Sequence, residues 1–278
     1  MTRRPGKGRR QIALKDRLAP VLISLVSVVV VFGAIAFFVG SAEQWPRIQN
    51  QFFSVEAMLE AAPGVARGFL VSLQIWLISL VCIGIWALVL AIFRAMSGPW
   101  FAPLRVFAIV YVDLFRGLPA LLLVLLFGFG IPALNLPGLP KEGLFWGGVA
   151  LILSYSAYAT EVYRSGIEAV HEGQGMAAKA LGLTQWQTLR YAILPQALRN
   201  VVPAMLNLVV ALQKDVALLS VLGVRDAVRE AQIYTARTFN YSSLVVAAIL
   251  FLLATIPLAR LTDHLQRRDR QRRLQGAK

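Results

Sequence analysis

Four charged side chains lie inside segments of this sequence that are otherwise long and apolar. Lys214 and Asp215 stand deep in the apolar run 198–222, and Asp113 and Arg116 stand in the run 104–129. A charge within a membrane-spanning helix costs roughly 2.5–3.5 kcal/mol on insertion scales, so such residues usually face a polar interior. These four are therefore the first candidates for contact with a transported solute, or for structural ion pairs between helices.

The spacing of these residues suggests how they are used. Asp113 and Arg116 are three residues apart, which places them on one face of a helix where they can pair. Gly117 and Pro119 follow and predict an interruption, and interrupted helices in transporters offer backbone groups to the charged ends of a substrate. Lys214 and Asp215 point about 100° apart, so one is free to meet a substrate while the other meets a neighbouring helix.

Two further positions belong to the candidate substrate path or lie near it. In the apolar run 144–163, Tyr155, Ser156 and Tyr158 are able to line a pore, although packing is the simpler role for at least one of the three. Glu161 and Arg164 are three residues apart near the end of that run. We expect them to form an interfacial ion pair that braces the following segment rather than to bind substrate.

No set of residues typical of catalysis or metal binding is present. There is no Ser/His/Asp arrangement and no G-x-x-x-x-G-K-[ST] phosphate loop. Cys82 is the only cysteine, and His171 and His264 are far apart with no accompanying Cys or Glu cluster. We expect no catalytic residue, no metal site, and no cofactor bound by this chain.

The composition points to a membrane protein. Hydrophobic residues make up 58% of the chain and the mean hydropathy is +0.65. About 20 apolar residues span a bilayer as a helix. The sequence predicts an all-α polytopic fold with about six transmembrane helices, near residues 20–39, 68–93, 104–129, 144–163, 198–222 and 242–261. Between the spans we expect a short amphipathic helix at 55–59 and a polar loop at 223–241.

The first apolar run has a rival interpretation as a secretory signal, because residues 39–42 faintly resemble a cleavage site. The run is longer than the 7–15 residues of an ordinary signal core, which favours an uncleaved span.

The net charge of +14 follows a topological rule. With the N-terminus inside, both basic ends, the loop 94–105 and the segment 161–195 lie on the cytoplasmic side, together with about twenty of the 28 Lys and Arg residues. A nucleic-acid partner is not expected, since no recognition motif accompanies the charge.

The segment 161–195 is the longest polar stretch between two apolar runs, and it predicts a folded helix–turn–helix. Ala177 and Ala178 favour a short helix with small side chains, and Gly182 can adopt the left-handed conformation that ends one. Thr184 and Gln187 match a capping box that starts a second helix. We expect one face of that helix to carry Trp186, Leu189 and Ile193, and Pro195 to end it.

This segment resembles the cytoplasmic coupling loop of ABC importer permeases, which reads EAA, three residues, Gly, nine residues, I-x-L-P. The matching residues are Ala177, Ala178, Gly182, Leu194 and Pro195. Met176 replaces the usual Glu, and Ala192 replaces Ile or Val. The flanks, including Gly173-Gln174 and Lys214-Asp215, resemble the branch that takes up polar amino acids.

The resemblance implies a five-helix permease core with one added N-terminal helix and a cytoplasmic coupling helix. The expected parts are a basic segment (1–19), the added helix with an external segment (20–67), the permease domain (68–262) and a basic tail (263–278). It implies a multi-pass protein of the bacterial inner membrane with both termini cytoplasmic. The implied partners are an ATP-binding cassette subunit that binds ATP and Mg, an external solute-binding protein, a second permease subunit, membrane lipids and an amino-acid substrate.

Hydroxyl residues of that family pattern are missing here. Leu118 stands in place of a threonine after Gly117, and Val216-Ala217 replace Thr-Ser after Asp215. This indicates either a more apolar substrate or pocket, or the non-binding half of a heterodimer.

Three other functions remain open: a permease for another small solute, a passive channel or membrane scaffold, and an enzyme acting on lipids.

Overall fold

The computed structural model describes residues 14–170 and 172–275, and every regular element in these ranges is a helix. The predictions that concern residues 1–13, His171 and residues 276–278, including parts of the two basic ends, fall outside the described residues. Two compact units are present, Met1–Phe53 and Ser54–Lys278. Each is described by itself.

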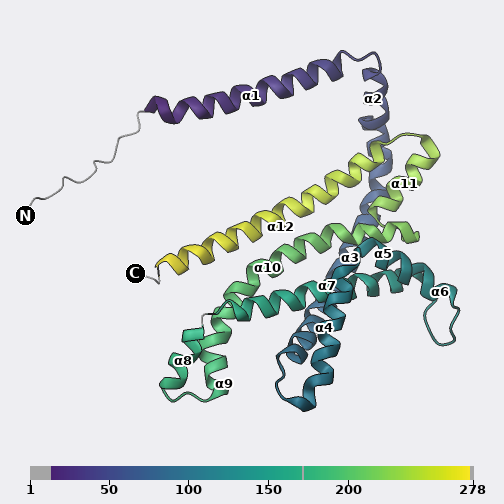
Figure 1. Cartoon of the computed structure of the whole chain (residues 1–278). Coiled ribbons are helices and arrows are strands. Elements are labelled where there is room, and N and C mark those ends of the chain that lie inside the picture. Colours follow the sequence, from purple (N-terminus) through teal and green to yellow (C-terminus); the bar gives the residue numbers. More distant parts are fainter. Residues whose placement is uncertain (1–13, 171, 276–278) are drawn as a thin grey trace, which may run out of the picture. The chain divides into compact units, whose positions relative to one another are not determined.

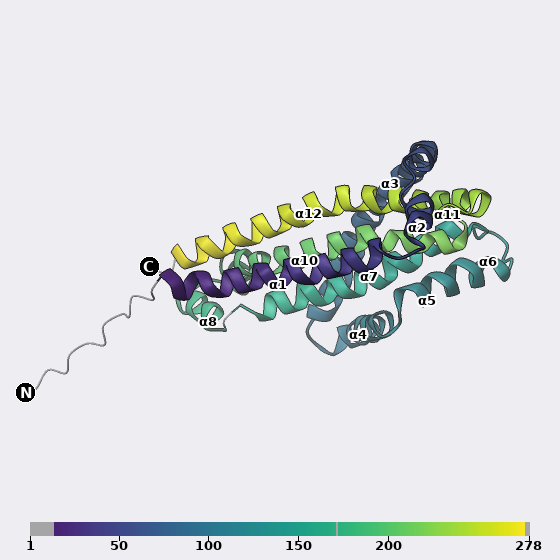
Figure 2. The same cartoon turned by 90° about the horizontal axis from the view of Figure 1, so that it is seen from above.

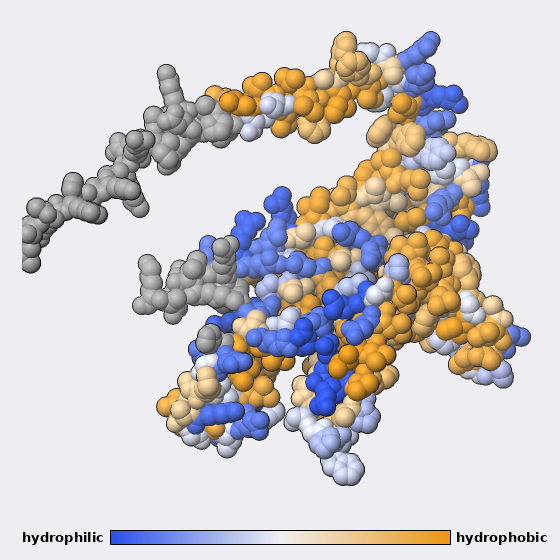
Figure 3. Space-filling view, viewed as in Figure 1, coloured by the Kyte–Doolittle hydropathy of each residue, from blue (hydrophilic) through white to orange (hydrophobic). Residues whose placement is uncertain are grey.

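The first unit contains α1 (Leu14–Gly40) and α2 (Trp45–Phe52). α1 covers the predicted span at 20–39, and residues 22–40 are all exposed. Figure 3 shows hydrophobic residues over the described part of α1. An apolar helix with no buried face is what a lipid-facing span requires, since lipid rather than protein then covers its side chains.

The second unit holds the remaining helices. They are α3 (Val55–Ala95), α4 (Ala102–Gly117), α5 (Ala120–Leu125), α6 (Ile131–Ala133), α7 (Gly143–Glu168), α8 (Glu172–Ala180), α9 (Gln185–Gln187), α10 (Leu194–Asp215), α11 (Ala227–Thr238) and α12 (Ser242–Gln275). Short 3₁₀ turns occupy Pro99–Phe101 and Val216–Leu222, and π-helical turns occupy Leu126–Gly130 and Thr188–Ile193.

α3 is longer than the sequence predicts. The expected separate helix at 55–59 is wrong, because one continuous helix starts after Ser54, whose Oγ accepts the Ala57 amide at 3.3 Å, and runs through Pro63. Ala61, Val65 and other small residues of this helix pack against α11 and α12. This tertiary packing outweighs the backbone hydrogen bond that Pro63 cannot donate.

α7 is the centre of the bundle. It packs against α3, α10, α4 and α5, and its residues Ala150, Leu151 and Tyr155 belong to the main hydrophobic core. Figures 1 and 2 both show α7, α10 and α12 running side by side, with α8 and α9 at one end. At Gly166 an added Cβ would lie 2.3 Å from Val201 Cγ2, so glycine is required for α7 and α10 to approach this closely.

The predicted polar loop at 223–241 is wrong, since most of it forms α11. Asp226 caps this helix by accepting the Arg229 amide at 2.8 Å. α11 lies directly on α3, because an added Cβ at Gly68 would meet the Asp226 carbonyl carbon at 2.5 Å. α12 also runs beyond the predicted span 242–261 into the basic tail.

Among the described residues, four helical stretches are long and apolar enough to cross a membrane. They are Leu22–Gly40, Trp45–Ala95, Gln185–Leu222 and Ser242–Arg268, and the bent pair Pro99–Gly117 and Ala120–Ala133 makes a fifth if it is one span. α7, which covers the expected span at 144–163, is not among them. Its buried side chains include Ser154, Ser156 and Thr160, so its surroundings are protein rather than lipid. The all-α polytopic fold is confirmed, and the count of six spans stays a prediction.

Candidate functional site

The predicted helix end at Gly182 is confirmed. Gly182 has φ +83°, and the amides of Gly182 and Leu183 donate to the carbonyls of Lys179 and Ala178 at 2.9 and 3.2 Å. This pair of bonds is the Schellman arrangement, in which a left-handed glycine lets the last carbonyls of a helix find donors. It ends α8 sharply and turns the chain toward α9.

The predicted capping box is also present. The Thr184 side chain accepts the Gln187 amide at 3.3 Å, and the Gln187 side chain accepts the Thr184 amide at 2.8 Å. The second helix does not end at Pro195, however, so that prediction is wrong. Its helical path continues through the π-helical turn Thr188–Ile193 into α10. Proline disrupts the regular α-helical bond four residues back, and the altered turn falls directly before it.

The face formed by these short helices is suited to contact with another protein. Trp186, Leu189 and Ile193 line one groove of about 580 Å³ together with Gly175 and Lys179, which confirms that the three share a face. Four large side chains of this segment are exposed over more than half of their area: Met176, Leu181, Trp186 and Tyr191. Single exposed apolar residues are common, whereas several on one short segment are typical of a surface that another protein or lipid covers.

The remaining predicted coupling residues divide between this surface and the support behind it. Ala177 is exposed, whereas Ala178 is 6% exposed and faces the protein. Gln174 accepts a hydrogen bond from Gln196 Nε2 at 3.3 Å, which ties α8 to the start of α10. Gly173 is half-buried, while Leu194 and Pro195 are exposed. The segment is therefore in contact with the start of α10.

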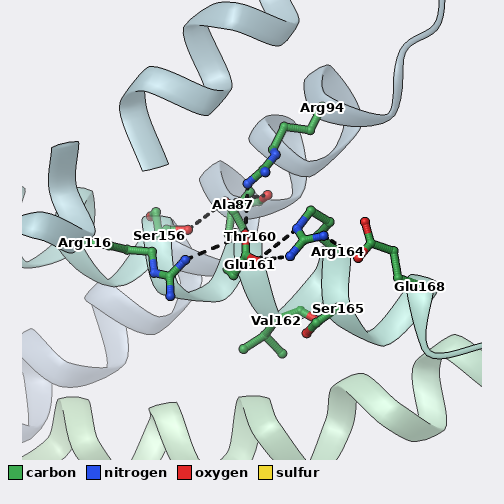
Figure 4. A network of polar contacts seen from close by, with 10 residues as sticks. All are labelled: Ala87, Arg94, Arg116, Ser156, Thr160, Glu161, Val162, Arg164, Ser165 and Glu168. Atoms are coloured by element: carbon green, nitrogen blue, oxygen red, sulfur yellow. Dashed lines mark hydrogen bonds and ion pairs between the residues drawn. The ribbon is translucent and has the colours of Figure 1, made fainter. Parts of the chain in front are cut away.

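A cluster of charged side chains lies where α7 leaves the bundle core, and Figure 4 shows it centred on Glu161. The Glu161 carboxylate pairs with Arg94 of α3 at 2.9 Å, with Arg116 of α4 at 3.8 Å, and with Arg164. Arg164 also pairs with Glu168. The expected Glu161–Arg164 pair is present, and it belongs to a network that joins three helices.

Arg116 is not used as the sequence suggests. Among the described residues its ion-pair partner is Glu161, and no ion pair with Asp113 is formed. Its guanidinium lies 5.7 Å from the centroid of the Tyr158 ring, and the Tyr158 hydroxyl donates to the Arg116 carbonyl at 3.4 Å. The expected Asp113–Arg116 pair is wrong because α7 offers Arg116 a carboxylate and an aromatic face.

The predicted interruption of the third apolar run is confirmed. α4 ends at Gly117, Leu118 is extended with ψ 140°, and α5 starts after Pro119. The two halves are bent by 102°. Asp113 and Pro119 are exposed beside this break, so both are accessible to a solute or to another subunit.

Lys214 and Asp215 stand at the end of α10, where the helix tightens into a 3₁₀ turn. The Tyr155 hydroxyl of α7 donates to Asp215 Oδ2 at 2.7 Å. Lys214 is exposed. The expectation that one of the two meets a neighbouring helix is confirmed for Asp215.

The structure brings some candidates together through α7. Asp215 contacts Tyr155, the rings of Tyr155 and Tyr158 lie 6.3 Å apart, and Tyr158 contacts Arg116, which pairs with Glu161. The line of polar contacts thus runs along one face of α7 for about two turns. Asp113, Pro119 and Lys214 lie outside this chain of contacts. Among the described residues no group of three or more His, Cys, Asp or Glu forms a possible metal site.

Sequence reasoning missed two members of the charged cluster, Arg94 and Glu168, and assigned Tyr155 no partner. Arg94 lies in the last turn of a long apolar helix. It is far from Glu161 in sequence, so no local sequence pattern links the two residues. Helix-to-helix contacts of this kind follow from packing angles that local patterns do not encode.

Comparisons with known proteins agree with this architecture. Residues 87–271 match the family described as binding-protein-dependent transport system inner membrane component. The glutamate/aspartate import permease protein GltK of Escherichia coli O6:H1 is 32% identical, over 78% of this chain and 98% of that protein. The arginine transport system permease protein ArtQ of Bacillus subtilis is also 32% identical, over 70% of this chain and 87% of that protein.

Two solved structures show the same fold. An amino acid ABC transporter crystallised with histidines superposes with a TM-score of 0.71 at 29% identity, covering 77% of this chain and 98% of that chain. The MetNI methionine ABC transporter superposes with a TM-score of 0.60 at 17% identity, covering 78% and 99%, which supports the fold alone. The resemblance to ABC permeases is confirmed, and the chain belongs to the family of inner membrane components of binding-protein-dependent transport systems.

Proposed function

We propose that this chain forms the translocation path of an ATP-driven importer of amino acids. The observation that supports the proposal is the line of polar contacts that Tyr155 and Tyr158 make along α7, which continues after Glu161 toward the segment α8–α9. The names of the relatives GltK and ArtQ and of the histidine-bound transporter support amino acids as the substrate class.

The working complex would contain two permease subunits, two ATP-hydrolysing subunits and an external solute-binding protein. ATP and Mg would be bound by the ATPase, so this chain would itself be non-catalytic. Its basic ends and α8–α9 would face the cytoplasm, in keeping with the distribution of Lys and Arg. The exposed residues Met176, Leu181 and Trp186 would then fit a groove of the ATPase.

The mechanism would be alternating access driven through α8. Closure of the ATPases would push α8, which packs on the turn Thr188–Ile193 at the root of α10. α10 ends at Asp215, and α7 ends in the Glu161 cluster that holds the broken helix at Arg116. One displacement of α8 would therefore reach both ends of the line of polar contacts, at Asp215 and at Arg116. Tight cores transmit such displacements because they change between discrete packings rather than deform smoothly.

The direct test is uptake in proteoliposomes that contain the chain with its ATPase and binding protein. We expect ATP-dependent accumulation of one or a few labelled amino acids from a panel, together with ATP hydrolysis stimulated by the loaded binding protein. Equilibration without ATP would replace the proposal with a passive channel. ATP-driven uptake of another solute class, with no amino acid taken up, would support the importer function and reject amino acids as its substrates.

A further inference from the structure

A groove of about 310 Å³ lies between α10 and α12, away from the line of polar contacts on α7. Its walls are apolar and come from Leu198, Val202 and Leu206 of α10 and Leu265 of α12. Two guanidinium groups join this lining, one from each helix: Arg199 and Arg268. A long apolar trough with basic groups on both sides differs from a substrate site for a free amino acid, which needs groups for both of its charged ends.

The two walls are held together by a polar clamp. Gln266 of α12 donates from Nε2 to the Pro203 carbonyl at 3.3 Å and to Asn207 Oδ1 at 3.4 Å. Pro203 and Gln266 also line the groove. The Gln266 side chain thus joins the two helices that form the groove.

The groove lies at a membrane boundary. Arg268 is the last residue of the candidate span Ser242–Arg268, and the α10 residues belong to the candidate span Gln185–Leu222. The sequence beyond the groove is strongly basic, with Arg267, Arg268, Arg270, Arg272 and Arg273 and a single acidic residue, Asp269, in seven positions. Figure 3 shows hydrophilic residues gathered toward the end of α12 from which the tail leaves.

We infer that this groove binds an anionic phospholipid of the leaflet that faces the basic tail. The headgroup phosphate lies between Arg199 and Arg268, and one acyl chain lies along Leu198, Val202 and Leu206. Basic pockets between membrane helices recognise lipid phosphates in this way, since the charge attracts the headgroup and the apolar wall accepts the chain. A soluble anion would leave the apolar wall exposed to water. The inference rests on the membrane placement of α10 and α12, not on the substrate or the energy source.

The test is native mass spectrometry of the full-length chain in detergent, titrated with phosphatidylglycerol, cardiolipin or phosphatidylcholine. We expect retained adducts of the two anionic lipids and few of phosphatidylcholine. The double variant Arg199→Gln with Arg268→Gln should lose roughly thirtyfold in apparent affinity for phosphatidylglycerol, from the usual contribution of each basic residue near an anionic surface. Val202→Trp, which adds bulk to the apolar wall without changing charge, should also reduce binding.

Arg260→Gln is the matched control, because Arg260 is an exposed arginine of α12 that does not line the groove. It should keep wild-type lipid binding. Equal loss in a double variant of Arg260 and Arg237 would show diffuse attraction and overturn the site. Displacement of the adduct by excess inorganic phosphate would show that a free anion suffices and would overturn the lipid assignment. Circular dichroism and gel filtration identify any variant that fails to fold. If the arginine variants fail, lipid binding by Val202→Trp tests the groove independently of them.

Discussion

Gly182 holds a backbone conformation that glycine adopts freely and asparagine tolerates. Its φ is +83°, and nothing lies within 4 Å of an added Cβ, so conformation rather than space restricts this position. A β-branched residue with positive φ is a strong outlier, at a cost of about 1–2 kcal/mol. We expect Gly182→Val to loosen the end of α8 and to reduce uptake per ATP hydrolysed, while membrane insertion stays normal.

Gly182→Asn is the matched control, because asparagine visits the left-handed region more readily than other residues. It should retain most of the coupling. The measurement is the ratio of substrate taken up to ATP hydrolysed in proteoliposomes. Wild-type coupling in the valine variant would reject a mechanical role for this turn.

Tyr155 gives Asp215 its hydrogen bond at 2.7 Å, from a side chain that is 6% exposed. A hydrogen bond to a charged group contributes about 1.5–3 kcal/mol, and its loss leaves the carboxylate without that donor. Tyr155→Phe should therefore lower uptake and the thermal midpoint together. Tyr111→Phe removes another buried hydroxyl, which donates to the Leu153 carbonyl at 2.8 Å, and should lower only the midpoint. Equal uptake in the two variants would place Asp215 outside the path.

At the scale of single residues, the sequence predicts local backbone features but not contacts between helices. The left-handed Gly182 and the Thr184–Gln187 capping box depend on neighbours three or four residues away, so the sequence predicts both. Arg116 illustrates the opposite case. The Asp113 spacing suggested a partner on the same helix, but α7 supplies Glu161 and the Tyr158 ring from more than forty residues away.

At the scale of elements, the Glu161 side chain joins three helices, α3, α4 and α7, through its ion pairs. Removal of its charge by Glu161→Gln leaves Arg94, Arg116 and Arg164 facing each other without their shared carboxylate. Breaking a fully buried pair costs roughly 3–5 kcal/mol, but the Glu161 and Arg94 side chains are each 21% exposed, so about 1–2 kcal/mol is expected here. The thermal midpoint should fall and ATP hydrolysis should lose its dependence on substrate.

The control for this change lies about two turns further along α7. Among the described residues the ion-pair partner of Glu168 is Arg164, and the Glu168 side chain is 59% exposed, so Glu168→Gln should be close to wild type. Similar effects of both variants would mean that the cluster acts through overall charge and does not connect the break in α4–α5 to α7.

Asp226 gives the contact between α3 and α11 a pH dependence. Burial raises the pKa of this carboxyl to about 6, above its ordinary value of 3.8, although it accepts the Arg229 amide. The folded protein therefore holds the proton more tightly than the unfolded chain, so this contribution is complete below about pH 4 and is lost as pH rises through 6. The thermal midpoint in detergent should be higher at pH 5 than at pH 7.5, reflecting about 1.4 kcal/mol between these two pH values.

Asp226→Asn keeps the acceptor of the helix cap and cannot titrate. The difference between wild type and this variant isolates the carboxyl from all other groups. It should be largest at pH 7.5, where the asparagine variant is the more stable protein. A difference that does not vary with pH would reject the raised pKa.

The elements themselves were predictable where one signal dominates. Long apolar runs located α1, α3, α10 and α12, and Gly117 and Pro119 located the break after α4. Proline misled the sequence interpretation at Pro195, which lies within a continuous helical path because a π-helical turn accommodates it. The expected short helix at 55–59 is instead the start of α3, which tertiary packing keeps continuous through Pro63. The charged stretch at 223–241 concealed α11, whose buried Ala227 and Ala231 are too small to give an apolar pattern.

At the scale of the molecule, the hydrophobic clusters found among residues 14–170 and 172–275 consist of residues after Ser54. The family match at 87–271 falls within the same unit. The sequence predicts a permease core with an added N-terminal helix, and this division stays a prediction, because its boundary at 67/68 falls inside α3. It could not show that α7, whose sequence looks like one span among six, is the helix on which the others pack.

This separation leads to a prediction for the first unit. A protease site inserted in the short connection 41–44, between α1 and α2, allows α1 to be cut after the protein has entered the membrane. Because the family match covers residues 87–271 and so excludes α1, we expect cleavage to leave ATPase binding and amino-acid uptake unchanged. Uptake is measured on one proteoliposome preparation before and after cutting, with a site-free protein treated in parallel. Loss of uptake with the ATPase still bound would assign α1 a part in transport, and loss of both would place it in the assembly of the complex.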